Sequence, residues 1–279
     1  MASPKLPVLT TVRQAYAAIL GHSDALGQIS RNWLIATAVA LLLGYLAFIG
    51  PQETERSFDR AAKGAAVITS LAFLVLLMGA YVVIVRWHRM IIRGIAPGET
   101  GTRAMSGAFL YFARATLLGM LGLTTALVMS MLPITLCHGI IEGEARRIFA
   151  IVVTALAVVL ALIVVARLSL NLPATALGDW TVNFRRSWEL TRGNTLRLIA
   201  GTLLASGPAL TMNVVTEIAI RADEAARGNA AVIAAVTVVT LLIAIVAGVI
   251  QAGFLSYAYV FFTRQKPMAE TVSSVSRVV

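Results

Sequence analysis

Six long apolar stretches recur along this chain as three pairs, one pair about every 83 residues. The first members begin near residues 33, 115 and 198, which are steps of 82 and 83. The second members begin near 65, 149 and 231, which are steps of 84 and 82. Repeated helical units stack because a single unit cannot bury its own apolar face. The chain is therefore expected to fold as three copies of one helical hairpin.

The composition indicates that these hairpins lie in a lipid bilayer. Hydrophobic residues make up 58% of the 279 residues and charged residues only 13%, whereas a soluble domain is typically about 25% charged. The hydrocarbon core favours apolar side chains and offers no water to the backbone, so helices predominate there. We predict an all-α, polytopic membrane protein with one integral membrane domain over residues 1–279. Its repeat units are expected at about 11–86, 100–167 and 181–263.

The lengths of the apolar stretches suit membrane spans. Most are near the 20 residues that cross about 30 Å of hydrocarbon. The last one is longer, so it must tilt, kink near Gly248 or Gly253, or project beyond the bilayer. The first one follows a polar segment that is too long for a signal peptide, so it is expected to remain as a span. The predicted spans are 31–50, 64–86, 112–137, 148–167, 197–220 and 230–262.

The basic residues between the spans predict the orientation. Both termini and the second and fourth loops together carry 15 Lys and Arg residues. The remaining loops carry seven, together with seven acidic residues. Because the Lys and Arg excess marks the cytoplasmic side, both termini are expected in the cytoplasm. Arginine outnumbers lysine 20 to 3 and alanine is abundant, which is typical of a GC-rich bacterial genome, so we expect a bacterial inner (plasma) membrane.

A short basic helix is predicted between the fourth and fifth spans, over residues 181–192 (TVNFRRSWELTR). On a helix, Phe184 and Trp188 share one face and the charged residues lie largely opposite. Gly193 suits a helix end in the left-handed conformation, and Asn194 can cap the helix that follows. This pattern is typical of a helix that lies in the membrane interface.

The charges around this helix are the leading candidate for a binding site. Basic side chains near the cytoplasmic leaflet attract anionic head groups by about 1 kcal/mol each, and tryptophan favours the headgroup level. Two alternatives stay open: these residues only set topology and anchor loops, or they dock a protein partner. The candidates for head-group binding are Arg185, Arg186, Trp188, Arg192 and Arg197.

The N-terminal segment repeats this pattern. Thr11–Leu20 is amphipathic, and Gly21 is expected to end the helix. Tyr16 precedes Gly21 by five residues, as Trp188 precedes Gly193. The middle copy has no clear glycine break, so the unit of interfacial helix, span, short turn and span is degenerate there.

The motifs RLSL at 167–170, LP at 172–173 and RRSWELTRGN at 185–194 resemble a bacterial family of six-span inner-membrane proteins. That family includes the membrane domain fused to some glycerophosphoryl diester phosphodiesterases and many standalone proteins of uncharacterised function. The resemblance implies a multi-pass plasma-membrane protein connected to lipids. It does not imply phosphodiesterase activity, because in the fused proteins a separate soluble barrel with acidic and histidine metal ligands performs catalysis. This chain has no room for that barrel and no such cluster.

The sequence contains no set of residues typical of catalysis or metal binding. His22, His88 and His138 are dispersed, and no HExxH motif occurs. Cys137 is the single cysteine, so an intrachain disulfide and a cysteine-based metal cluster are excluded. We expect no cofactor, no metal and no enzymatic activity.

Polar residues inside the predicted spans are few. Glu217 lies one turn from the outer end of the fifth span, with Arg221 at i+4, so it forms an interfacial ion pair or marks a proton or substrate site. Asn213 and Gln251 can hydrogen-bond between helices. The run at 206–208 (SGP) predicts close packing with a proline kink. Arg114 is expected to extend its charge to the interface. Small residues that allow close packing are Gly119, Gly122, Gly201, Ala205 and Gly248.

Three functions remain open. The leading hypothesis is a non-enzymatic membrane protein that binds or organises anionic lipids, or serves as a subunit or scaffold beside another membrane protein or a second copy. Nucleic-acid binding is disfavoured because the basic residues are spread over the loops. The second hypothesis is a transporter or channel for a small apolar or amphipathic solute, since many carriers are built from repeats. The third is an enzyme acting on lipid head groups through His88, Glu99, Asp179 or Glu189.

Overall fold

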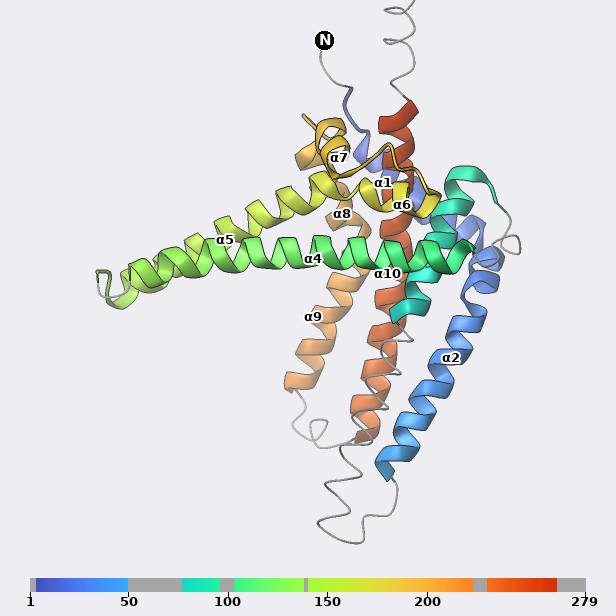
Figure 1. The fold of residues 1–279 in the computed structure, drawn as a ribbon. Coiled ribbons are helices and arrows are strands. Elements are labelled where there is room, and N and C mark those ends of the chain that lie inside the picture. The colour runs from blue at the N-terminus through green and yellow to red at the C-terminus, as the bar shows by residue number, and fades with distance from the viewer. Residues whose placement is uncertain (1–3, 50–76, 96–102, 138–139, 223–229, 265–279) are drawn as a thin grey trace, which may run out of the picture.

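A computed structural model describes residues 4–49, 77–95, 103–137, 140–222 and 230–264. The described part of the chain is all-α, as predicted (Figure 1). In addition to the labelled helices, residues 77–93 form a helix that follows α2. The labelled helices are α1 (Val8–Gly21), α2 (Ser23–Ile49), α4 (Arg103–Leu136), α5 (Gly143–Leu168), α6 (Asn171–Leu177), α7 (Phe184–Leu190), α8 (Thr195–Ala205), α9 (Gly207–Ala222) and α10 (Ala230–Arg264).

Three stretches within these helices are long and apolar enough to cross a membrane. They cover Gly107–Leu136, Gly143–Leu177 and Ile245–Arg264. Six spans were predicted from the sequence, and part of the second one, 64–76, lies outside the described residues. Three helices that can span a bilayer support a membrane protein, whereas the number six stays a prediction.

Consecutive long helices pack against each other in pairs. The ring of Trp33 in α2 lies so close to Gly79 in helix 77–93 that an added Cβ would come within 1.9 Å of it. In the α4–α5 pair, a Cβ on Gly122 would lie 2.7 Å from a methyl group of Val165. Helices α9 and α10 also pack side by side. Glycine at these two positions therefore sets how closely the paired helices approach.

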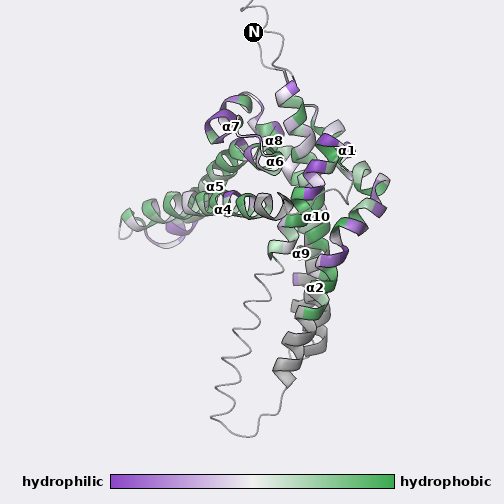
Figure 2. Cartoon of the chain, turned by 45° about the vertical axis from the view of Figure 1, so that its right-hand side comes forward, coloured by the Kyte–Doolittle hydropathy of each residue, from purple (hydrophilic) through white to green (hydrophobic). Residues whose placement is uncertain are grey.

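The α4–α5 hairpin runs crosswise to α2, α9 and α10 (Figures 1 and 2). In Figure 2 it is largely hydrophobic. In the most apolar 18-residue segments of α4 and of α5–α6, only 17% and 6% of the residues are buried. The corresponding segment of α10 is 61% buried. An exposed apolar surface of this extent would be unfavourable in water. The hairpin therefore needs lipid or another apolar surface around it.

The carboxyl-terminal half of α10 forms the centre of the molecule. Phe254 is fully buried, and a Cβ on Gly201 of α8 would lie 2.1 Å from its ring. Gly253 faces α1, where an added Cβ would lie 3.3 Å from the Cβ of Ala15. Helix α10 runs through Gly248 and Gly253 as one element of 35 residues. Gly253 therefore allows α1 to pack closely against α10.

The stretch predicted as the fifth span is interrupted at Ser206, the first residue of the SGP run where the sequence predicts a kink. Helix α8 ends at Ala205 and α9 begins at Gly207. Pro208 has no N–H, so it cannot donate to the carbonyl of Leu204 four residues earlier. That carbonyl instead accepts the hydroxyl of Tyr16 from α1 at 3.0 Å. The break is thus tied to the N-terminal helix.

Helix α1 ends at Gly21, as the sequence predicts. One face of it is buried, through Thr11, Val12, Ala15 and Ala18. This helix packs against α8 and α10. The amphipathic pattern of α1 thus reflects its packing against other helices of the protein.

Candidate functional site at the end of helix α5

The chain that follows α5 folds into a short buried helix, α6. Six of its seven residues are buried. Gly178 ends it with φ +71°, a conformation that favours glycine. The amide of Asn171 then donates to the carbonyl of Val182 at 2.8 Å and closes the loop back onto α6. The RLSL and LP motifs of the sequence thus form a compact buried connection between α5 and α7.

Three arginines from other helices hold α6 in place. From helix 77–93, Arg89 Nε donates to the carbonyl of Ala176 at 2.6 Å, and Arg93 Nη2 to that of Leu177 at 2.7 Å. From α4, Arg114 Nη1 donates to Thr175 Oγ1 at 2.5 Å. The last carbonyls of a helix lack helical partners and carry partial negative charge. These arginines were predicted to set topology or reach the interface, but each of them also binds α6.

Asp179 connects the end of α6 to α10. Its carboxylate accepts the hydroxyl of Tyr259, together with the backbone N–H and hydroxyl of Thr181 at 2.9 and 2.6 Å. Partial burial alone would raise the pKa of Asp179, but these hydrogen bonds and the charge of Arg93 outweigh it and lower the pKa. Asp179 therefore stays ionised and tethers the loop.

Helix α7 is docked on the end of α5 through Arg167. The guanidinium of Arg167 lies over the Trp188 ring, 3.8 Å from its centroid, and Nη2 donates to the Trp188 carbonyl at 2.8 Å. In return, the buried hydroxyl of Ser187 donates to the carbonyl of Arg167 at 2.7 Å. Thr191 Oγ1 reaches the same carbonyl at 3.3 Å. The orientation of α7 on α5 is therefore set by four polar or stacking contacts.

This docking points several basic side chains outward. The Arg185 side chain is 90% exposed. Glu189 pairs with Arg185 at 3.4 Å and with Arg186 at 3.2 Å, and these partners, Arg186 first, lower its pKa. Asn183 caps the helix by accepting the N–H of Arg186. Glu189 supplies one negative charge here, whereas Arg185, Arg186 and the exposed Arg192 supply three positive charges. The net charge of this surface is therefore positive.

Asn194 and Arg197 bind the N-terminal segment. Asn194 stands at the N-cap position of α8, as predicted, but its side chain does not cap the helix. Its Oδ1 accepts the N–H of Leu6 at 2.8 Å, and its Nδ2 donates to the carbonyl of Pro4 at 3.0 Å. Arg197 Nη1 donates to the carbonyl of Leu6 at 2.8 Å. Arg197 was predicted to bind head groups, but at least one of its N–H groups donates a hydrogen bond within the protein.

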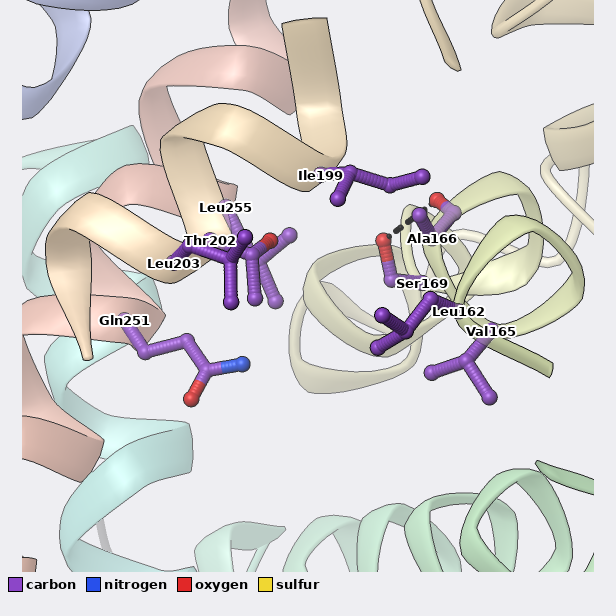
Figure 3. A pocket seen from close by; sticks show the side chains of 9 residues that line it. All are labelled: Leu162, Val165, Ala166, Ser169, Ile199, Thr202, Leu203, Gln251 and Leu255. Carbon is purple, nitrogen blue, oxygen red and sulfur yellow. Dashed lines mark hydrogen bonds between the residues drawn. The ribbon is translucent and has the colours of Figure 1, made fainter. Parts of the chain in front are cut away.

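The three polar residues predicted inside the membrane are Glu217, Asn213 and Gln251, and of these the described side chains of Glu217 and Gln251 do not form one site. Glu217 is exposed on α9, and Asn213 belongs to α9 but its side chain is outside the described residues. Gln251 lines a pocket of about 60 Å³ between α5, α8 and α10 (Figure 3). Ser169 and Thr202 are the other polar residues of that lining, which is otherwise aliphatic.

His88 forms a buried hydrogen-bonded chain that the sequence did not predict. Its Nδ1 lies 2.7 Å from Ser256 Oγ and its Nε2 lies 3.2 Å from the Tyr111 hydroxyl. Ser256 donates to the carbonyl of Ala252, so it accepts from Nδ1–H, and Nε2 accepts from Tyr111. Burial lowers the pKa of His88 to about 3. The neutral imidazole thus joins helix 77–93, α4 and α10.

The residues considered for head-group chemistry have separate partners. His88 bonds to Ser256 and Tyr111, Asp179 to Tyr259 and Thr181, and Glu189 to arginines of α7. Glu99 and His138 lie outside the described residues. Within the described ranges, no three His, Cys, Asp or Glu side chains gather so that they could hold a metal ion.

Comparison of the chain with known protein families, with curated proteins and with solved structures finds no match. What this site can bind is therefore indicated by its own side chains. Guanidinium donors face inward to the carbonyls of α6 and of the N-terminal segment. Arg185 of α7 faces outward and Arg186 is partly exposed, beside the end of an apolar helix.

Proposed function

We propose that this chain is a multi-pass plasma-membrane protein without catalytic machinery that binds anionic phospholipid head groups on the cytoplasmic side. The observation that carries the proposal is the docking of basic helix α7 on the end of apolar helix α5. Arg167 and Trp188 hold α7 by stacking and by a hydrogen bond of 2.8 Å. The charges of α7 are therefore presented at one fixed place, next to a helix that can span the bilayer.

The end of α5 suits the level of lipid head groups. Its body is apolar and largely exposed, as expected of a helix that contacts hydrocarbon. Its last residues carry Arg167 and lead to Trp188, and both residue types favour the interface. The Arg185 side chain extends from this point with 90% of its surface exposed. Each arginine near the surface of an anionic leaflet contributes about 1 kcal/mol of attraction.

The proposed topology has six spans as three hairpins, with both termini in the cytoplasm. The Lys and Arg counts and the pairwise packing of consecutive helices support it. In Figure 1 the α4–α5 hairpin lies crosswise to α2, α9 and α10, so the proposed topology requires this hairpin to turn parallel to them in the bilayer.

The test measures lipid retained by the purified protein. Arg185→Gln, Arg186→Gln and Arg192→Gln are combined in one variant, which is extracted gently and analysed by native mass spectrometry. Three lost charges are expected to reduce retained phosphatidylglycerol at least tenfold. The control combines Arg146→Gln and Arg147→Gln, two exposed arginines at the opposite end of α5, and is expected to retain lipid normally. Equal retention by both variants would overturn the proposal.

A scaffold or complex subunit is the second candidate. The exposed apolar surface of the α4–α5 hairpin favours it, because helices of a partner membrane protein could pack there as well as lipid. The same mass spectra decide between the two. A second protein at a fixed ratio favours the scaffold, and phospholipid alone favours lipid binding.

A further inference from the structure

We infer that the pocket between α5, α8 and α10 holds the ester end of one phospholipid acyl chain, with the amide of Gln251 donating a hydrogen bond to the ester carbonyl. This inference rests on the proposed function, and it adds recognition of the glycerol-ester region to recognition of the head group. The pocket takes one chain of the lipid, so the second chain remains in the bilayer.

The lining of the pocket matches a hydrocarbon chain. Leu162 and Val165 of α5, Leu203 of α8 and Leu255 of α10 surround it. Leu162 and Leu203 are 39% and 47% exposed, so the pocket opens onto the outer surface of these apolar helices. Its volume of about 60 Å³ is several times the roughly 10–15 Å³ that one water needs. That space accommodates an ester group and a few methylenes, and the rest of the chain can follow the exposed face of α5.

The polar groups of the pocket match an ester carbonyl. Gln251 points its amide nitrogen into the pocket (Figure 3), while its Oε1 has only a long contact of 3.5 Å with Ser206 Oγ. Within the described part of the chain, the Nε2 group has no hydrogen-bond partner. An amide donor beside aliphatic side chains gains when an acceptor arrives. A carbonyl oxygen is an acceptor only, and it can reach the hydroxyl of Thr202 from the same space.

The pocket lies at the depth that a glycerol ester requires. Ala166 and Ser169 line it, and Arg167 stands between them in the sequence with its guanidinium stacked on Trp188. In a glycerophospholipid the ester carbonyls come directly beneath the charged head group. A lipid whose phosphate meets the arginines of α7 therefore brings its ester carbonyl to the level of Gln251.

The experiment compares ester-linked phosphatidylglycerol with the ether-linked analogue of equal head group and chain length. The two lipids are presented as an equal mixture to the purified protein, and native mass spectrometry counts each. The wild type is expected to retain the ester lipid about fivefold over the ether lipid, the effect of one hydrogen bond. Gln251→Leu is expected to retain both equally. Gln14→Leu, on the exposed face of α1, serves as the matched control and keeps the preference.

A second variant tests the space itself. Ala166→Leu adds volume inside the pocket while leaving Gln251 in place, and it is expected to reduce retention of both lipids. Normal helix content and elution of each variant show that it folds. Equal retention of ester and ether lipid by the wild type, or an unchanged preference in Gln251→Leu, would overturn the inference.

The outcomes separate this inference from the proposed function. If the arginine variant of α7 loses lipid and the wild type shows no ester preference, head-group binding stands and the pocket inference fails. If the ester preference persists in the arginine variant at unchanged total retention, the pocket holds lipid and head-group binding fails. If the wild type retains neither the ester lipid nor the ether lipid, the pocket inference and the proposed function are both overturned.

Discussion

At the scale of single residues, His88 is a buried polar group whose partners come from distant helices. His88 is fully buried, yet both of its ring nitrogens have partners, Ser256 and Tyr111. Because both nitrogens are hydrogen-bonded, burying the neutral imidazole costs little free energy. Protonation would place a charge away from water, and Nε2 could no longer accept a hydrogen bond from Tyr111. The protonation state of His88 therefore affects the stability of three helices at once.

Stability is expected to fall as the pH drops from about 6.5. The folded pKa of His88 is about 3, below the unfolded value of about 6.5, so in this interval the unfolded state binds a proton that the folded state does not. The loss reaches about 2 kcal/mol between pH 8 and pH 5. Thermal unfolding in detergent across this range measures it. The variant His88→Asn is expected to be less stable throughout but to show a shallower decline. Parallel declines would contradict the assignment.

Gly201 and Gly119 are a matched pair for testing close packing. A Cβ on Gly201 would lie 2.1 Å from the buried Phe254 ring, whereas one on Gly119 would meet nothing within 4 Å. Gly201→Ala is expected to lower the free energy of unfolding by about 1–3 kcal/mol through overpacking. Gly119→Ala is expected to leave it unchanged or to raise it by up to about 1 kcal/mol through helix propensity. Denaturant titration of both variants checks this, and equal effects would contradict it.

At the scale of elements, the short helices α6 and α7 owe their positions to long-range contacts. Each contains seven residues, too few for a stable isolated helix. Arginines from helix 77–93 and α4 bind α6, and Arg167 binds α7. The local sequence of α7 supplies its Asn183 cap, and the helix ends at Leu190, shorter than the predicted 181–192. Gly193, three residues later, has the predicted left-handed conformation with φ +81°. Where α7 lies is decided by Arg167.

Removing the Trp188 ring is expected to loosen α7. Trp188→Ala loses the stacking with Arg167, which is worth about 0.5–2 kcal/mol, so amide hydrogen exchange over residues 184–190 should accelerate about 2- to 30-fold. Trp180→Ala is the control, because that ring lies under Arg114 at 5.1 Å and is 65% exposed. Exchange in α7 should not change in the control. Unchanged exchange in Trp188→Ala would show that Ser187 and Thr191 suffice.

At the scale of the whole molecule, α10 and the end of α5 organise the fold, and the α4–α5 hairpin extends away from them (Figure 1). One buried cluster joins α1, α5, α6, α8 and α10, and a second joins α1, α2, helix 77–93 and α10. Little of the hairpin is buried beyond its base. The orientation of this hairpin therefore depends on what surrounds it.

The proposed topology places the tip of the α4–α5 hairpin outside the cytoplasm. Cys137 is the single cysteine and lies at this tip, so a membrane-impermeant maleimide is expected to label it in intact spheroplasts. In a Cys137→Ser background, Glu142→Cys should also be labelled, whereas Asp24→Cys should react only after permeabilisation. Labelling of the tip residues only after permeabilisation would contradict six spans with cytoplasmic termini.

The sequence by itself determined the features that depend on neighbouring residues. Apolar runs produced the all-α class, Gly193 adopted the left-handed φ of +81° just after α7, and Pro208 accompanied the interruption of the fifth apolar stretch. These outcomes follow from local backbone rules, because a missing N–H or a positive φ acts within one turn.

Only the tertiary structure decided which groups meet. Asn194 was predicted to cap its own helix, but its side chain binds Leu6, 188 residues away. The arginines that hold α6 lie 61 to 87 residues from their partners, and nothing in their local sequence indicates those partners. Gln251 lines a pocket because α5 and α8 pack beside its own helix, α10, at this point. Such contacts depend on how helices pack in space, since a guanidinium or an amide can pair with many acceptors, and packing selects one.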